Sequence, residues 1–335
     1  MPYWEGFQFP LRQAGFGRLC CKMVVSVSPE SGQVKTFCGV EMSKQTISLV
    51  TYSDLPNLDP DDQLLKVALE KRGFVVKPLI WDQCVSARDS EFCIMRSAWD
   101  YHRKYEQFCT WLRETAARTR MFNTPETMLW NSRKTYLAEL QEAGIAIVPT
   151  VFITNENRQK LCDILKAQGW NEAVVKPSIG LATSGVKKLS ASTELSEAEM
   201  HVDDLLKHSE VMVQQYLASV HDYGERALIF IEGQLSHCVR KAPFQKLAVA
   251  FEAGERAVTA SEEEIEFASR VLRHLKEVPL YARVDLIRDN SNKPVLIELE
   301  LVEPSLFLQT NPESAEKFAD AIIERMESAQ VLANA

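Results

Sequence analysis

Apolar and polar residues along the first third of the chain follow two alternating periods. Short apolar runs with the spacing of buried strands are separated by amphipathic runs with the spacing of helices. The predicted strands are 47–52, 74–80 and 92–95, and the predicted helices are 59–72 and 105–118. Strands that alternate with helices form a parallel sheet with helices on its faces. We therefore predict an α/β domain over 43–122.

The next part of the chain, 123–217, opens on a helical pattern and continues mainly in short strands. Gly144 and the following apolar stretch indicate where the first helix ends. The predicted helices are 132–143 and 157–168, and the predicted strands are 145–148, 151–153, 173–177, 186–189 and 211–217.

The C-terminal part, 218–330, is richer in strands. Glu232–Gly233–Gln234 has the composition of a hairpin turn, with glycine at its bend. The predicted strands are 227–231, 235–240, 281–287 and 295–301, and the predicted helices are 262–276 and 313–327. We expect an α+β unit with a largely antiparallel sheet.

Composition narrows the function and the setting. The net charge of −8 argues against nucleic-acid binding, which needs a basic face. No apolar run approaches the roughly 20 residues that cross a bilayer. The eight cysteines lack the spacing of a zinc site, which favours a reducing, cytoplasmic setting. Residues 1–42 show no sustained periodicity. We interpret them as a disordered extension or a start codon placed too far upstream, in preference to a targeting segment.

One loop has the composition of a phosphate-binding loop. The turn after the first strand, 53–62, contains no glycine, so neither a GxGxxG turn nor a P-loop is present there. The strand that carries Lys176 instead opens into a stretch of small residues whose backbone N–H groups could cover phosphates. Its candidate residues are Ser178, Gly180, Ser184 and Gly185. An ordinary Gly/Ser connection has the same composition, so the loop alone does not decide the function.

Three carboxylates near the C-terminus strengthen the case for a phosphate-binding site. Glu298 and Glu300 are two residues apart on one strand and therefore share a face. The turn-forming stretch 288–294 can pair this strand with the one that carries Asp285, which would bring that carboxylate opposite the glutamates. Clustered carboxylates repel one another unless a cation lies between them, and Mg²⁺ is the natural occupant. The alternative is a solvated outer face of an edge hairpin.

A series of short motifs gives the chain a family resemblance. In order they are Asn131–Lys134, Val174–Pro177, Gln214–Leu217, Gly224–Arg226, Arg240–Lys241, Arg283–Asp285 and Glu298–Glu300. Together they resemble the ATP-grasp superfamily in its glutathione synthetase branch, most of all the ligases of cycloserine biosynthesis. The resemblance covers about 43–327. It implies a pre-ATP-grasp α/β domain followed by an α+β ATP-grasp fold, with ATP held between two subdomains.

The resemblance also implies a role for each motif. Lys134 and Lys176 would hold the ATP phosphates beneath the 178–185 loop, which has fewer glycines than many relatives. Glu225 would lie near the ribose or the phosphates. The adenine contacts would be Gln214, Gln215, Tyr216 and Leu217. The ligands of Mg²⁺, or of Mn²⁺ in its place, would be Asp285, Glu298 and Glu300, the last standing where glutathione synthetases have asparagine. The residues that hold the acceptor and stabilise transferred charge would be Arg226, Arg240, Lys241 and Arg283.

Substrate contacts are expected from the first domain and from the segment after the acidic strand. Ligands of open α/β sheets bind at the carboxyl ends of the strands. Asp59, Asp61 and Asp62 stand at this edge, although capping of a helix explains Asp59 equally well. His221 and His237 are interpreted as packing or surface residues. The proposed substrate residues are Arg96, Ser97, Trp99, Asp100, Tyr101 and Ser305.

We therefore predict an ATP- and Mg²⁺-dependent ligase that activates a carboxylate as an acyl phosphate and joins it to an amine. Its substrate would be small and amino-acid-like, with reaction between two molecules or cyclisation within one. Two alternatives stay open: a small-molecule kinase with the same ATP site, and a non-catalytic nucleotide-binding protein. The sequence does not identify the substrate, and a homo-oligomer is compatible with it.

Overall fold

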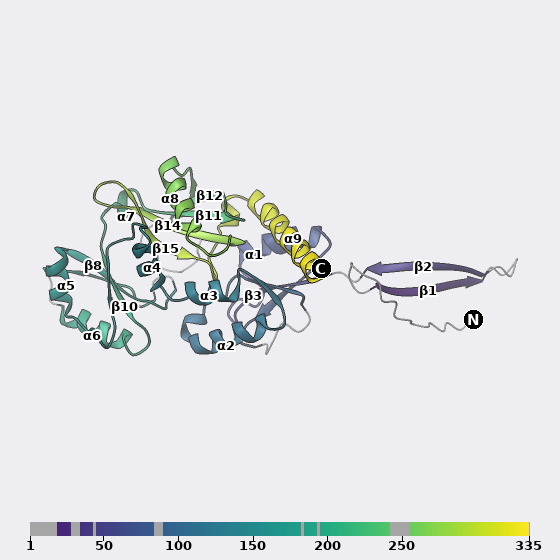
Figure 1. Cartoon of the computed structure of the whole chain (residues 1–335), viewed down its shortest axis with the longest axis horizontal. Coiled ribbons are helices and arrows are strands. Elements are labelled where there is room, and N and C mark those ends of the chain that lie inside the picture. The colour runs from purple at the N-terminus through teal and green to yellow at the C-terminus, as the bar shows by residue number, and fades with distance from the viewer. Residues whose placement is uncertain are drawn as a thin grey trace.

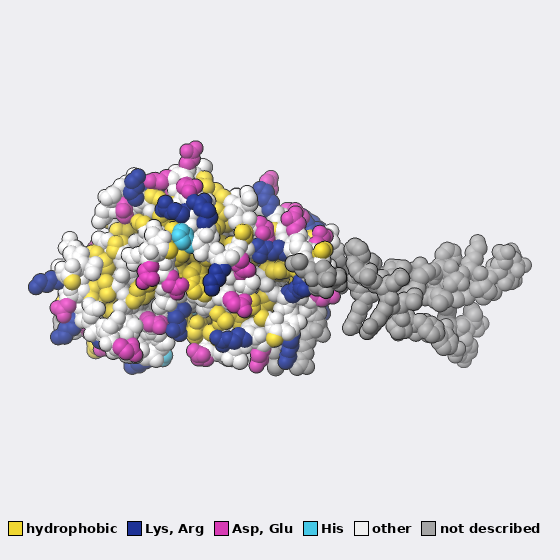
Figure 2. Space-filling view, in the orientation of Figure 1, with side chains coloured by type: hydrophobic (Ala, Val, Ile, Leu, Met, Phe, Trp, Pro, Cys, Tyr) yellow, Lys and Arg dark blue, Asp and Glu magenta, His cyan; other side chains and the backbone are white. Residues whose placement is uncertain are grey.

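A computed structural model describes residues 19–27, 34–42, 45–83, 90–181, 184–192, 195–241 and 255–334. Three sheets make up the body of the protein, and Figure 1 shows them with their helices. In Figure 2, basic and acidic side chains are interspersed over the face in view. Within the described ranges, no helix is both long enough and apolar enough to span a membrane.

The N-terminal domain contains a four-stranded parallel sheet, in the order β4–β3–β5–β6. Asp59 accepts a hydrogen bond from the Asp61 backbone N–H at 2.9 Å, and Pro60 is the first helical residue, so α1 begins where the sequence predicted. The parallel pairing of these four strands confirms the predicted sheet. Its elements are β3 (Thr46–Thr51), α1 (Pro60–Lys71), β4 (Val75–Ile80), β5 (Phe92–Met95), α2 (Tyr105–Ala116) and β6 (Arg120–Phe122).

The middle of the chain forms a second, antiparallel sheet, in the order β7–β10–β8–β9, which we call the lid sheet. The lid sheet and its helices enclose a core of their own, to which Ile153, Leu165, Val175 and Val202 belong. Two short helices, α3 (Pro125–Asn131) and α4 (Tyr136–Glu142), precede it. Its elements are β7 (Thr150–Ile153), α5 (Leu161–Gln168), β8 (Glu172–Pro177), β9 (Lys187–Ser190), α6 (Ser196–Leu205) and β10 (Val211–Gln215).

The C-terminal sheet has five antiparallel strands, in the order β13–β12–β11–β14–β15. One face packs against α8, and the other packs against the N-terminal domain and α9. In Figure 1 this sheet lies between the lid sheet and α9. Its elements are α7 (Ser219–Asp222), β11 (Glu225–Ile231), β12 (Gln234–Lys241), β13 (Arg256–Val258), α8 (Glu262–Arg273), β14 (Tyr281–Arg288), β15 (Pro294–Glu300) and α9 (Glu313–Asn334).

One apolar core joins the N-terminal domain to the C-terminal sheet. Ile47 and Leu49 from β3, Ile229 from β11, Tyr281 from β14 and Phe318 from α9 all belong to it. Because their side chains are buried together, separating the two units would expose apolar surface to water. The N-terminal domain is therefore fixed against the sheet that carries the acidic strands.

The structure differs from the sequence-based expectations in three places. Where we expected disorder, β1 (Leu19–Val27) and β2 (Val34–Met42) pair as an antiparallel hairpin, in keeping with their content of β-branched residues. The predicted strand at 145–148 contributes only a bridge between Ile147 and Leu296. The helices α3 and α6 were not predicted, and the helix predicted at 132–143 is the shorter α4.

Candidate functional site

The three predicted metal ligands lie on one face of the β14–β15 hairpin. Asp285 stands directly opposite Glu298, and Arg283 stands opposite Glu300. Residues opposite one another in an antiparallel pair project to the same side of the sheet, so the three carboxylates share a face. We call this the acidic face, defined by Asp285, Glu298 and Glu300. The hairpin expected from the turn-forming residues is confirmed.

Two basic side chains lie among the carboxylates of the acidic face. Arg283 Nε donates to Asp285 Oδ1 at 2.9 Å, and Arg283 also pairs with Glu300. Lys241 Nζ lies 2.6 Å from Asp285 Oδ2 and 2.8 Å from Glu225 Oε2. Burial acts to raise the pKa of Asp285, but Arg283 and Lys241 outweigh it and hold that pKa below its ordinary value. Asp285 is therefore an ionised, fully paired carboxylate.

The pKa of Glu300 is shifted in the opposite direction. Burial and the negative charges of Glu298 and Asp285 together raise its pKa to about 7, against the lowering effect of Arg283. Lys134 pairs with Glu298 in addition, so each carboxylate of the acidic face has a basic partner. Carboxylate oxygens are the ligands that Mg²⁺ prefers.

The acidic face is not arranged around an ion in this structure. Among the described residues, no group of three or more acidic, histidine or cysteine side chains is placed so that it could hold a metal ion. Arg283 and Lys241 instead neutralise Asp285 directly. The donor set fits a divalent cation by its chemistry and its common face, while its side-chain geometry would have to change. The assignment of these residues as metal ligands stays a prediction.

Both candidate phosphate lysines lie beside the acidic face. Lys134, between α3 and α4, is buried, and its Nζ lies 3.0 Å from Glu298 Oε1 and 2.6 Å from the Gly180 carbonyl oxygen. Lys176 projects from β8, where burial lowers its pKa, Glu298 counters that effect and Lys134 adds to it. Two ammonium groups and one carboxylate therefore influence one another strongly at this point, between the lid sheet and the acidic strand.

The candidate phosphate loop begins at a well-anchored residue. The Ser178 backbone N–H donates to the Glu210 carbonyl oxygen at 2.8 Å, and Ser178 Oγ donates to Glu210 Oε2 at 2.7 Å. The Lys134 backbone N–H donates to the Ser178 carbonyl oxygen at 2.9 Å. Gly185 has a φ of +72°, which side chains with a Cβ rarely adopt. Ala182 and Thr183, at the tip, lie outside the described residues.

The predicted adenine segment lies at the end of β10 and just beyond it. Gln214 Nε2 donates to Thr150 Oγ1 at 2.9 Å. The backbone N–H groups of Gln215 and Tyr216 already donate to carbonyl oxygens of the protein. Lys188 Nζ lies 3.5 Å from the centroid of the Tyr216 ring, and Leu217 is buried. The segment contains an aromatic ring and a buried apolar side chain, and two of its backbone N–H groups already have partners.

Arg96 and Ser97 of the N-terminal domain use their polar groups inside the protein. Arg96 is 2% exposed; its Nε donates to Asp62 Oδ1 at 2.8 Å and its Nη2 to the Pro304 carbonyl oxygen at 3.0 Å. Ser97 is fully buried and also donates to Asp62. Because both side chains are buried and bonded within the protein, the structure does not support the expectation that they contact a substrate. Arg96 thereby anchors the segment that follows the acidic strand, whereas Ser97 anchors Asp62.

Three further predicted substrate residues border the same segment. Trp99 Nε1 donates to the Glu303 carbonyl oxygen at 3.0 Å. Asp100 accepts from Trp81 Nε1 at 2.7 Å, and the Tyr101 hydroxyl lies 3.5 Å from the Ser132 carbonyl oxygen. Their polar groups are also engaged within the protein, and Trp99 is partly exposed. A substrate contact by these three residues stays a prediction.

Arg226 and Arg240, which were expected to hold the acceptor together with Lys241 and Arg283, do not lie on the acidic face. Ala227 stands opposite Asp285, so Arg226, its neighbour in β11, projects to the other face of the sheet. Arg240 stands opposite Arg226 and shares that face. Both guanidinium groups donate to the Tyr223 carbonyl oxygen, at 2.6 and 3.0 Å. They satisfy carbonyl groups at the end of α7, and of the four predicted bases only Lys241 and Arg283 lie on the acidic face.

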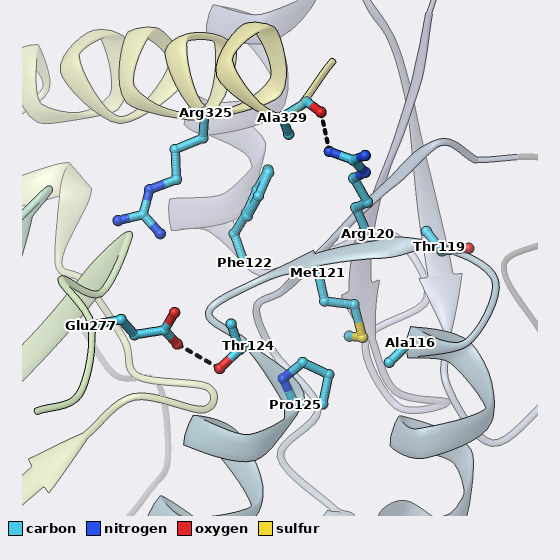
Figure 3. Close-up of a pocket in the computed structure, with 10 residues that line it drawn as sticks. All are labelled: Ala116, Thr119, Arg120, Met121, Phe122, Thr124, Pro125, Glu277, Arg325 and Ala329. Atoms are coloured by element: carbon cyan, nitrogen blue, oxygen red, sulfur yellow. Dashed lines mark hydrogen bonds between the residues drawn. The ribbon is translucent and has the colours of Figure 1, made fainter. Parts of the chain in front are cut away.

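A separate pocket lies between β6 and α9 (Figure 3). It encloses about 330 Å³ and contains none of the predicted site residues. Arg120 donates to the Ala329 carbonyl oxygen, Thr124 bonds Glu277, and Arg325 pairs with Glu232. Since these polar side chains already have partners, we assign the pocket no role in the chemistry.

Comparison with known proteins agrees with this architecture. Residues 47–123 match the N-terminal domain of the D-cycloserine synthetase DcsG, and residues 134–310 match the ATP-grasp domain of prokaryotic glutathione synthetase. The chain is 30% identical over 300 residues to the cycloserine biosynthesis protein DcsG of Streptomyces lavendulae, which covers 84% of this chain and 98% of that protein. It is 25% identical over 234 residues to a glutathione synthetase of Ralstonia nicotianae, covering 66% of each chain.

Solved structures give the same result. The crystal structure of the D-cycloserine synthetase DcsG superimposes with a TM-score of 0.75 at 30% identity, covering 84% of this chain and 99% of that one. A D-alanine–D-alanine ligase from Bacillus anthracis, complexed with ATP, shares the fold with a TM-score of 0.60 at 17% identity. It covers 85% of this chain and 99% of the ligase. The chain therefore belongs to the ATP-grasp family of carboxylate–amine ligases, in the glutathione synthetase branch, with the N-terminal domain of D-cycloserine synthetases.

Proposed function

We propose that this ligase uses Mg-ATP to activate a carboxylate of a small amino-acid-like substrate as an acyl phosphate, which an amine then attacks to form a C–N bond. The observation that carries the proposal is the ion pair between Lys134 and Glu298, which joins a candidate phosphate lysine to a candidate metal ligand, with Lys176 close enough for both groups to affect its pKa. Such a site can hold the phosphates of a nucleotide beside carboxylates suited to a metal ion.

The nucleotide would lie between the lid sheet and the acidic face. Lys134 and Lys176 would pair with its phosphates, and the 178–185 loop would cover them. Glu225 would lie near the ribose or the phosphates. The base would lie against Tyr216 and Leu217, next to Gln214 and Gln215. A bound phosphate would compete with Glu298 for Lys134, because phosphate brings more charge to the lysine than one carboxylate does.

Mg²⁺ would be held by Asp285, Glu298 and Glu300 together with the phosphates, with Mn²⁺ as a substitute. The bound ion would neutralise charge on the transferred phosphoryl group. Because Arg283 and Lys241 now pair with Asp285, they would exchange that partner for another anion when the metal binds. Carboxylates and phosphates thus compete for the same cations.

Arg283 and Lys241 would then hold the carboxylate that is activated. Arg283 presents a planar fork that suits bidentate binding of a carboxylate or a transferring phosphoryl group. Both cations are largely buried, where an ion pair is worth more than at the surface. Their task is to orient the substrate oxygen toward the γ-phosphate and to stabilise charge as it develops.

Turnover of ATP tests the proposal. The full chain is incubated with Mg-ATP and a panel of amino acids, and ADP release and new C–N bonds are followed by coupled assay and mass spectrometry. The panel includes compounds with an amine and a carboxylate in one molecule, because a D-cycloserine synthetase is among the relatives. Asp285→Asn should abolish substrate-dependent ADP. A phosphorylated product without a new C–N bond, or no ADP across a broad panel, would contradict the proposal.

A further inference from the structure

The connection between α3 and α4 holds the base of the candidate phosphate loop, 178–185, through three contacts. The Lys134 backbone N–H donates to the Ser178 carbonyl oxygen at 2.9 Å, and Lys134 Nζ donates to the Gly180 carbonyl oxygen at 2.6 Å. Arg133 Nη1 lies 3.0 Å from Oε1 of Glu210, the residue before β10. Two neighbouring residues of the connection therefore contact the lid where β8 ends and β10 begins.

Glu210 joins these contacts through both oxygens of one carboxylate. Its Oε1 accepts from Arg133, its Oε2 accepts from Ser178 Oγ at 2.7 Å, and its backbone carbonyl oxygen accepts from the Ser178 N–H at 2.8 Å. Ser178 is fully buried, whereas the side chains of Glu210 and Arg133 are 26% and 40% exposed. The bonds to Ser178 are thus better shielded from water, and the ion pair with Arg133 is the weaker contact because solvent screens it.

The α3–α4 connection is itself fixed to the C-terminal sheet. Tyr136, the first residue of α4, exchanges two hydrogen bonds with the Leu299 backbone. Asn131, the last residue of α3, donates to the Leu299 carbonyl oxygen at 2.8 Å and accepts from the Leu301 N–H at 2.7 Å. A loop that is held to this connection therefore keeps a fixed position relative to the acidic strand β15.

The chain enters and leaves the lid sheet at the opposite end of β10. Gln214 pairs with Thr150, and the Gln215 N–H donates to the Pro149 carbonyl oxygen at 2.9 Å. The five residues of β10 separate this end from Glu210 by about 17 Å. The covalent connections thus secure one end of the lid sheet, and the contacts of Glu210 secure the end at which the phosphate loop begins.

We propose that Glu210 is a positioning residue, which holds the phosphate loop against the α3–α4 connection so that the loop and Lys134 meet the nucleotide phosphates in a fixed arrangement. Glu210 acts through Ser178 and Arg133 and takes no part in the chemistry itself. A loop that is already ordered loses less conformational freedom when the nucleotide binds. This inference rests on the proposed function, because the position of the loop affects binding only if the loop covers phosphates.

Alanine and glutamine variants of Glu210 test the inference in the full chain. Binding of Mg²⁺ with the non-hydrolysable analogue AMPPNP is measured by calorimetry, and amide hydrogen exchange of the peptide that contains Gly180 and Gly185 is measured without nucleotide. Glu210→Ala should weaken Mg-AMPPNP binding about tenfold, on the scale of a hydrogen bond to a charged group, and should speed exchange in this peptide. Glu210→Gln keeps an acceptor for Ser178 and should recover most of both effects.

Glu199→Ala is the matched control. Glu199 lies on α6 of the lid, its side chain is 25% exposed, and it pairs with Arg158 and accepts from the Leu161 N–H at the start of α5. It thus also binds one arginine and one neutral donor. Its replacement should lower the free energy of unfolding about as much as Glu210→Ala does, on the scale of the same two kinds of bond, with Mg-AMPPNP affinity and loop exchange near wild type.

Arg133→Met separates positioning from direct contact with the nucleotide. It should weaken Mg-AMPPNP binding by about threefold, because a partly exposed ion pair contributes little. Its addition to Glu210→Ala should cause no further loss, since both changes remove the same contact. Unchanged Mg-AMPPNP affinity in Glu210→Ala, an equal loss in Glu199→Ala, or full additivity of the Arg133 and Glu210 changes would overturn the inference. A wild-type protein that does not bind Mg-AMPPNP would contradict the proposed function, and the inference with it.

Discussion

Lys134 Nζ lies 3.0 Å from Glu298 Oε1 and so joins the α3–α4 connection to the acidic strand. The same ammonium group donates to the Gly180 carbonyl oxygen at 2.6 Å. One side chain thus links the start of the phosphate loop with a candidate metal ligand. The pair marks the place where nucleotide and metal would meet.

Replacement of Lys134 by methionine should abolish this link. ADP release should fall by about 100-fold or more, since one preorganised charge on the reacting group contributes on that scale. The free energy of unfolding should fall by roughly 1 to 3 kcal/mol, because the partly buried Glu298 carboxylate loses its ion-pair partner. Coupled ADP assays and urea unfolding measure the two effects.

Lys207→Met is the matched control for that change. Lys207 pairs with Asp204 on the surface, where an ion pair contributes roughly 0 to 1 kcal/mol. Activity and stability should both stay near wild type. Equal losses in the two variants would argue against a special role for Lys134.

Arg240 and Lys241 are neighbours in β12 that project to opposite faces, so their alanine variants should behave differently. Lys241→Ala should reduce ADP release by about 100-fold, because it removes the partner of Asp285. Arg240→Ala should lower stability by roughly 1 to 3 kcal/mol through lost hydrogen bonds to α7 carbonyl groups, with activity within a few-fold of wild type. Activity is measured below both melting temperatures. A larger loss of activity in Arg240→Ala would reverse our assignment of the two faces.

Asp59 should make stability depend on pH. Burial raises its pKa from 3.8 to about 6, against the lowering effect of its hydrogen bond from the Asp61 N–H. The folded state therefore binds more protons than the unfolded state between these values, and this contribution to stability is lost as pH rises from about 4 to 6. Asn retains the N-cap without the charge.

Thermal unfolding of Asp59→Asn checks this expectation. The variant should match wild type near pH 4 and be more stable above pH 6, by on the order of 2 kcal/mol. Asp54→Asn, at an exposed position before α1, should show no such divergence. A constant difference across the pH range would contradict the assignment.

Tyr136 should control the position of the acidic strand. Its hydroxyl donates to the Leu299 carbonyl oxygen at 2.7 Å and accepts from the Leu299 N–H at 2.8 Å. Tyr136→Phe leaves both buried backbone groups without this partner and should cost roughly 1 to 3 kcal/mol of stability. Mg-ADP affinity should fall as well, because Glu298 and Glu300 flank Leu299. Calorimetry and urea unfolding measure the outcome.

Tyr105→Phe provides the comparison for Tyr136. It removes a half-buried hydroxyl contact with Ser132 Oγ at 3.0 Å, away from the acidic strand. Its effect on Mg-ADP affinity should be negligible. If Tyr136→Phe binds Mg-ADP as wild type does, the hydroxyl serves folding alone.

The acidic face could be predicted only in part. The register set by the turn, with Leu286 opposite Leu296, would place Asp285 opposite Ile297, and a bulge between Asp285 and Leu286 moves it opposite Glu298. Glu298 and Glu300 share a face because side chains alternate along a strand and these residues are two apart. The same alternation separates Arg240 from Lys241. The prediction treated adjacent bases as one group and thereby placed two arginines on the wrong face of the sheet.

The burial of Arg96 could not be predicted in this way. Its partners are Asp62, 34 residues earlier, and the Pro304 carbonyl group, 208 residues later. Only the folded chain brings them together. The helix α6 was missed for another reason. It carries few apolar residues, and only the folded structure shows that Ala198 and Val202 are buried in the lid core.

The separate core of the lid sheet has a consequence for motion. Most of its buried residues contact one another, and a few, such as Met212 of β10, belong to the core of the C-terminal sheet. The cores of the N-terminal domain and the C-terminal sheet are merged. A rotation of the lid would therefore expose less apolar surface to water than separation of the other two units. We therefore expect the lid to rotate against a rigid body made of the N-terminal domain and the C-terminal sheet. This rotation would require Lys134 to release the Gly180 carbonyl oxygen.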